Sequence, residues 1–91
     1  MNYKKQHIET LILACQRNDQ KAQMELYQRY NKKLFYSAYR IVKNTEDALD
    51  AVQEGFITAF QKLGQYQASG SFEGWLHKIV VRKSIHYYQK N

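Results

Sequence analysis

Proline is absent from this chain of 91 residues, and its four glycines all lie at or after Gly55. Because proline breaks helices and glycine weakens them, the first half of the chain can form long helices without interruption. The single cysteine, Cys15, cannot form an internal disulfide and is typical of a reducing cytoplasm. No segment approaches the roughly 20 apolar residues of a membrane-spanning helix. We therefore expect a cytoplasmic protein without membrane contact.

Residues suited to catalysis or metal binding are also scarce. The histidines, His7, His77 and His86, are far apart in the sequence and have no cysteine or carboxylate at metal-ligand spacing. No glycine-rich phosphate loop follows a strand, and no nucleophile stands in a recognisable signature. The sequence predicts a protein that is not an enzyme and that needs no metal or cofactor.

Apolar residues at helical spacing, by contrast, run through most of the chain, which is 44% hydrophobic. A short helix is predicted from Ile8 to Cys15, and a long one from Gln20 to Lys43 after an N-cap at Asn18-Asp19. A third helix begins at Asn44 or Thr45, a loop covers residues 64–71, and a fourth helix follows the N-cap Ser71. These short connections predict one all-α domain over residues 1–91, a small bundle of about four helices.

The same spacing predicts which side chains form the core. On the second helix two apolar stripes predict burial across a wide arc: Leu26, Tyr30, Leu34, Ala38 and Ile41, and beside them Tyr27, Phe35, Tyr39 and Val42. The later helices add Ala48, Val52, Phe56, Ala59, Phe60 and Leu63, and then Phe72, Trp75, Leu76, Ile79 and Val80.

Charge is distributed unevenly along the chain, whose net charge is +6. Residues 1–43 carry +6, residues 44–63 carry −3 and residues 72–91 carry +3. A basic protein suits an anionic partner such as nucleic acid, and an acidic segment within it indicates a second partner surface.

The acidic segment places Asp47, Asp50 and Glu54 on one side of the third helix, with Gln53 beside them. Such a stripe suits a basic partner helix, although a solvated helix face is the commoner explanation of the spacing alone. On the fourth helix, Lys78, Arg82, Lys83 and His86 lie near aromatic rings, as in proteins that bind single-stranded nucleic acid. The polar loop before this helix could bind the edge of a base extruded from the strand, although an ordinary interhelical turn is the commoner explanation.

Three motifs in order resemble the sigma factors of the extracytoplasmic-function (ECF) group. Residues 47–56, DALDAVQEGF, resemble the family's D-A-x-D-x-x-Q-E-x-F, and residues 72–79, FEGWLHKI, resemble F-x-x-W-L-x-x-I. Upstream, LYQRY at residues 26–30, with Leu34, Ala38 and Arg40, resembles L-Y-x-R-Y…L…A-x-R. The resemblance spans about residues 26–90 and implies the amino-terminal domain of such a sigma factor, called sigma domain 2 or region 2.

This resemblance implies a transcription initiation module that binds core RNA polymerase and melts the promoter minus-ten element by capturing its non-template strand. It assigns contact with the clamp helices of the β′ subunit to Asp47, Asp50, Gln53 and Glu54. It assigns DNA binding to Tyr66, Gln67, Ala68, Ser69, Gly70, Ser71, Lys78, Arg82, Lys83 and His86. It also implies an anti-sigma factor as a partner, and a second, helix-turn-helix domain in the whole protein that nothing in this chain resembles.

The chain departs from the family pattern at three positions. Leu49 stands where the family usually has Glu, Arg82 where many members have Asn, and His86 where Asp or Asn is common. A guanidinium only donates hydrogen bonds, so Arg82 contacts either phosphate or a guanine edge, and base preference does not carry over. A helical interaction module that binds proteins alone is the alternative, and it predicts no preference for single-stranded DNA.

Overall fold

The computed structural model describes residues 3–66 and 70–90, and the four predicted helices are all present. The elements are α1 (Ile8–Gln16), α2 (Gln20–Val42), α3 (Thr45–Lys62), the single-turn 3₁₀ helix η1 (Leu63–Gln65) and α4 (Phe72–Lys90). The 3₁₀ turn occupies the start of the predicted loop. The all-α prediction is confirmed.

Helix α2 begins at the predicted cap. The Asp19 carboxylate accepts hydrogen bonds from the backbone N–H groups of Lys21, at 3.0 Å, and Ala22, at 3.2 Å. These are among the N–H groups that a helix start leaves without an internal partner. The Tyr3 hydroxyl donates to the same carboxylate, at 2.6 Å, and so ties the amino-terminal segment to the cap.

A turn of two residues then reverses the chain between α2 and α3. Lys43 adopts a left-handed conformation with φ of 58°, and its N–H donates to the Tyr39 carbonyl at 2.8 Å. The Asn44 side chain next accepts from the Asp47 N–H at 2.9 Å, as the predicted N-cap of α3. Because the connection is so short, α3 packs antiparallel along α2.

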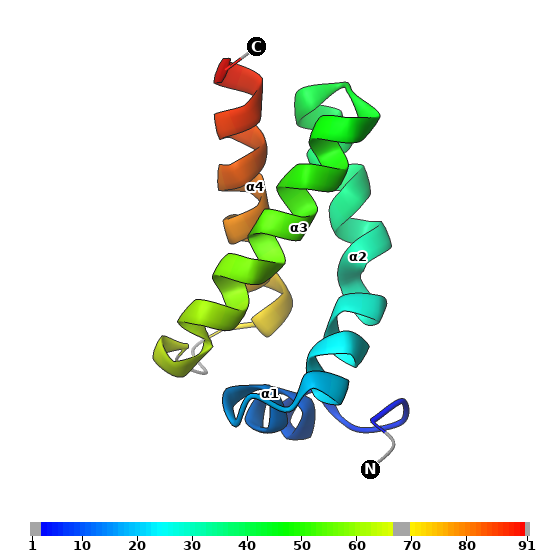
Figure 1. Cartoon of the computed structure of the whole chain (residues 1–91), viewed down its shortest axis with the longest axis vertical. Helices are drawn as coiled ribbons and strands as arrows, with labels where there is room; N and C mark the ends of the chain where they lie inside the picture. Colours follow the sequence, from blue (N-terminus) through cyan, green and yellow to red (C-terminus); the bar gives the residue numbers. More distant parts are fainter. Residues whose placement is uncertain (1–2, 67–69, 91) are drawn as a thin grey trace.

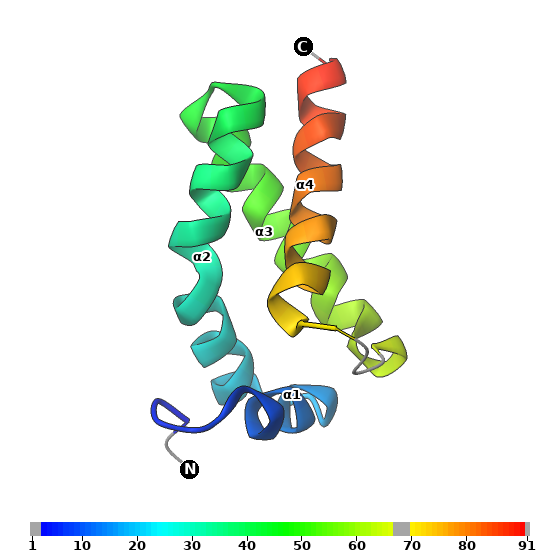
Figure 2. The same cartoon turned by 180° about the vertical axis from the view of Figure 1, so that it is seen from behind.

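Helices α2, α3 and α4 lie side by side, with α3 antiparallel to the other two, and α1 crosses one end of the group (Figures 1 and 2). This arrangement brings the amino-terminal half of α3 next to the carboxyl-terminal half of α4. The two charged segments predicted from the sequence are therefore neighbours in space. No helix in the described part of the chain is long and apolar enough to cross a membrane.

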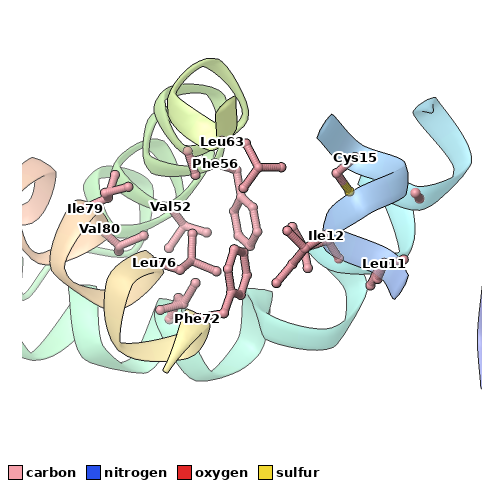
Figure 3. Close-up of a cluster of buried hydrophobic side chains, with 14 of the residues drawn as sticks. Leu11, Ile12, Cys15, Val52, Phe56, Leu63, Phe72, Leu76, Ile79 and Val80 are labelled. Carbon is pink, nitrogen blue, oxygen red and sulfur yellow. The ribbon is translucent and has the colours of Figure 1, made fainter. Parts of the chain in front are cut away.

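The core is a single cluster to which all four α-helices and η1 contribute, and Figure 3 shows side chains of α1, α3 and α4 meeting in it. The fully buried aliphatic side chains are Leu11, Leu26, Leu34, Leu63, Leu76 and Val80. Between α3 and α4 the backbones approach closely at Gly55, where a Cβ atom would lie 2.6 Å from Val80 Cγ2. Ser84 is buried as well, and its hydroxyl donates to the Val80 carbonyl at 2.8 Å.

Several predicted core positions are only partly covered. Tyr30, Ile41, Phe60 and Trp75 are half-buried. Tyr39 is 41% exposed, so its predicted burial is wrong. Its ring stacks on Phe35, at a centroid distance of 6.0 Å, on the outside of α2. The helix is covered by neighbours over a narrower arc than its two apolar stripes suggest.

Candidate functional site

The three carboxylates of the acidic stripe lie toward the edge of α3 that borders α4, whereas Gln53 lines a hollow on the α2 side. Asp47 is half-buried, and Asp50, Gln53 and Glu54 are exposed. Ala51, Val52 and Gly55 turn inward from the same helix and anchor it in the core. The structure thus keeps all four predicted residues on the outside of one firmly packed helix.

Tyr87, near the end of α4, connects that helix to the acidic stripe. Its hydroxyl donates a hydrogen bond to the Glu54 carboxylate. This bond, partial burial and the negative charges of Glu54, Asp50 and Asp47 raise the pKa of Tyr87 to about 12. All three carboxylates therefore disfavour ionisation of this one hydroxyl.

Sequence reasoning missed this role of Tyr87. The structure packs it, half-buried, against the core and binds it to Glu54. Only the antiparallel packing of α3 and α4 brings together two residues that are 33 positions apart.

The basic residues of α4 face the same region from the other side. Glu54, Thr58, Lys62, Ile79, Arg82, Lys83 and His86 line a groove of about 360 Å³ between α3 and α4. The structure thus brings Arg82, Lys83 and His86 together with Glu54, which the sequence had assigned to a different partner. Lys78 is exposed on α4 but does not line this groove. The two predicted surfaces share a border.

The loop before α4 is described only at its two ends, and Gln67, Ala68 and Ser69 lie outside the described residues. Tyr66 is half-buried, with its ring 5.4 Å from that of Phe72 and 5.1 Å from that of Trp75. Gly70 has φ of 91°, a conformation that suits glycine. Ser71 accepts from the Gly74 N–H at 2.9 Å and is the predicted N-cap of α4.

A hollow of about 570 Å³ opens between α1 and this end of α4. Tyr66, Gly70 and Ser71 form part of its wall, and Ile8 and Ile12 face them from α1. The loop ends predicted to contact DNA therefore adjoin a space of the size that ligand sites usually have.

The described residues contain no group of three His, Cys, Asp or Glu side chains that could hold a metal ion. His77 instead pairs with the Ser37 hydroxyl, at 3.2 Å, between α2 and α4. Burial, with the nearby Asp19 charge, raises the pKa of the Cys15 thiol to about 11, which disfavours the reactive thiolate.

Comparison with known families identifies the chain. The model of Sigma-70 region 2 matches residues 26–91, most of the sequence. The chain belongs to the sigma-70 region 2 family. The match begins at Leu26, where the first of the three motifs begins, and it includes the whole of α3 and α4.

The relatives of this sigma region 2 include ECF sigma factors. It is 44% identical over 57 residues to the ECF RNA polymerase sigma factor SigE of Mycolicibacterium smegmatis, covering 63% of this chain and 22% of that protein. It is 32% identical over 73 residues to the RNA polymerase sigma-H factor of Pseudomonas aeruginosa, covering 80% of this chain and 38% of that protein. It is 28% identical over 83 residues to the ECF RNA polymerase sigma factor SigW of Bacillus subtilis, covering 91% of this chain and 44% of that protein.

The chain thus spans less than half the length of each of these relatives. Together with the family match they confirm the resemblance to ECF sigma region 2. The chain is a sigma-factor domain of the region 2 family.

Proposed function

We propose that this domain docks on core RNA polymerase through Asp47, Asp50, Gln53 and Glu54 and binds the non-template strand of the minus-ten element. The strand would run along the loop at residues 66–71 and the α4 residues Lys78, Arg82, Lys83 and His86. The observation that carries the proposal is the shared border of the two charged surfaces, where Glu54 and three basic side chains of α4 line one groove. A protein that holds polymerase and an opening strand together needs such neighbouring sites.

The chemistry of each surface supports its proposed partner. Exposed carboxylates on a rigid helix attract and orient a basic helix, such as a clamp helix of the β′ subunit. Cationic side chains bind the phosphates of a single strand, and nearby rings can stack on its bases. The half-buried Tyr66 offers only part of its ring for such stacking.

The decisive experiment measures binding of the folded chain to a β′ clamp-helix fragment. We expect salt-sensitive binding by the wild type and its loss in the Asp50→Lys/Glu54→Lys double variant. Two single variants provide a matched comparison, because each reverses one charge. Asp50→Lys alters the stripe and should weaken binding, whereas Glu9→Lys alters an exposed residue of α1 and should not.

Absence of binding by well-folded wild type at hundreds of micromolar, about 5 kcal/mol of binding free energy, would contradict the polymerase role. The protein-binding module would then become the leading function. Equal binding of single-stranded and double-stranded promoter DNA would favour the same alternative. The anti-sigma factor, the cytoplasmic location, the single-domain boundaries and the helix-turn-helix domain of the whole protein stay predictions.

A further inference from the structure

Cationic side chains from two helices converge on the groove between α3 and α4. Arg82, Lys83 and His86 come from α4, and Lys62 comes from the last turn of α3. Lys62 belongs to neither predicted surface, because its place in the same groove as Arg82 depends on how the two helices pack. Thr58 also lines the groove and adds a hydroxyl donor, and Ile79 adds an apolar side chain.

The charge in this groove is not balanced from within the protein. Within residues 3–66 and 70–90, ion pairs join Arg29 to Glu25 and Lys33 to Glu73, and none involves Lys62, Arg82 or Lys83. The one carboxylate in the groove, that of Glu54, accepts the Tyr87 hydroxyl instead. Three permanent cations and His86 therefore face one carboxylate that is already hydrogen-bonded. An anion is the ligand that such a site favours.

We infer that this groove holds a backbone phosphate of the bound single strand, with Lys62 and Arg82 as its ligands from opposite walls. The inference rests on the proposed DNA-binding function and assigns Arg82 to phosphate and not to a guanine edge. Lysine, arginine and threonine side chains all donate hydrogen bonds to phosphate oxygens. Lys62, Arg82 and Lys83 outnumber the one carboxylate in the groove, and this excess of positive charge favours an anionic phosphate over an uncharged base edge.

The two assignments of Arg82 differ in a measurable way. A residue that binds phosphate contributes equally on every sequence and adds to the salt dependence of binding. A residue that binds a guanine edge contributes on guanine-containing strands alone. Binding of the chain to short single strands with and without guanine, measured by fluorescence anisotropy over a range of salt concentrations, separates them.

We expect Lys62→Gln and Arg82→Gln each to weaken binding by the same factor on all strands. Each should also reduce the slope of log affinity against log salt by about 0.7, the contribution of one phosphate contact on a single strand. Lys32→Gln is the matched control, because Lys32 is an exposed lysine at the hollow between α2 and α3. The slope of log affinity against log salt for Lys32→Gln should stay closer to that of the wild type. Circular dichroism checks that each variant remains helical.

Two outcomes would overturn the inference. Arg82→Gln could lose affinity on guanine-containing strands only, or Lys62→Gln could behave like Lys32→Gln. Displacement of the strand by inorganic phosphate better than by chloride at equal ionic strength would support it, because free phosphate would compete for the same donors. If instead the wild type binds no single strand at all, the proposed DNA-binding function itself fails. The first two results leave that function intact.

Discussion

The two edges of α3, one toward α4 and one toward α2, differ in how closely they pack and in which side chains they expose. Toward α4, Gly55 lets the backbones approach closely, and charged side chains of both helices meet over the contact. Toward α2, the rings of Tyr27 and Phe56 pack at 4.8 Å, yet apolar side chains stay exposed above them. Leu49 is 47% exposed, and Ile57 is 57% exposed. The closely packed edge is therefore the charged one. Judged by exposed apolar side chains alone, the opposite edge of the helix would be taken for the binding surface.

The hollows beside α3 show the same difference. Along the α2 edge, spaces of about 270 Å³ and 560 Å³ adjoin Leu49 and Ile57 respectively. On the α4 edge the groove has four basic side chains in its wall. A fixed α3–α4 contact holds charged groups at defined positions, which binding of a charged partner requires.

The largest expected effect comes from opening the α3–α4 contact. Gly55→Ala would place a methyl group 2.6 Å from Val80 Cγ2 and 3.3 Å from Val80 Cα. Valine has few rotamers with which to yield, so overpacking should lower the free energy of unfolding by about 1–3 kcal/mol despite the better helix propensity of alanine. Urea denaturation followed by circular dichroism measures the change.

Gly64→Ala is the control for this substitution, because no atom lies within 4 Å of its added methyl group. Its free energy of unfolding should equal or slightly exceed that of the wild type. Equal stability of the two variants would show that the α3–α4 contact tolerates an added methyl group.

A smaller effect is expected when charge is added to the α2 edge. Leu49→Glu introduces the residue that the ECF pattern usually has, one position from Asp50. It should strengthen binding to the clamp-helix fragment by about 0.2–1 kcal/mol, the range of an exposed ion pair. Ile57→Glu adds the same charge about two turns further along α3 and should help less. A larger gain from Ile57→Glu would move the proposed docking surface toward the carboxyl-terminal end of α3.

The smallest effect concerns Tyr87. Its pKa in the folded protein, about 12, lies above the ordinary value of 10.0. The bond to Glu54 therefore adds stability that is fully present below pH 10 and is lost as the pH rises toward about 12. In Tyr87→Phe, stability should fall less steeply over this pH range, and the ultraviolet titration should lose one late-ionising tyrosine. Tyr88→Phe removes a neighbouring, exposed tyrosine and leaves the bond to Glu54 in place.

The sequence predicted most of the fold because helix signals are local. Asp19, Asn44 and Ser71 each cap the helix predicted for them, since an N-cap bonds to N–H groups only two or three residues away. The prediction for Tyr39 was wrong because periodicity shows which residues share a face but not how much of that face a neighbouring helix covers.

The candidate site could be predicted only one helix at a time. The members of the acidic stripe and the basic residues of α4 follow from spacing along the chain. The bond between Tyr87 and Glu54, and the presence of Lys62 and Arg82 in one groove, depend on the relative position of α3 and α4. That position is set by packing at Gly55 and Val80, and no local pattern in the sequence encodes it.

One guanidinium also ties the amino-terminal segment to α2. Arg29 on α2 donates to the carbonyls of Tyr3, at 2.9 Å, and Gln6, at 2.7 Å, while its Nε binds Glu25. These carbonyls precede the first helix and are not part of a helix or strand. Their partner stands on α2, where Glu25 holds the guanidinium from one turn away. Anchoring of the amino-terminal segment and helix formation in α2 are therefore coupled, because unwinding this part of α2 would release the segment's carbonyls to water.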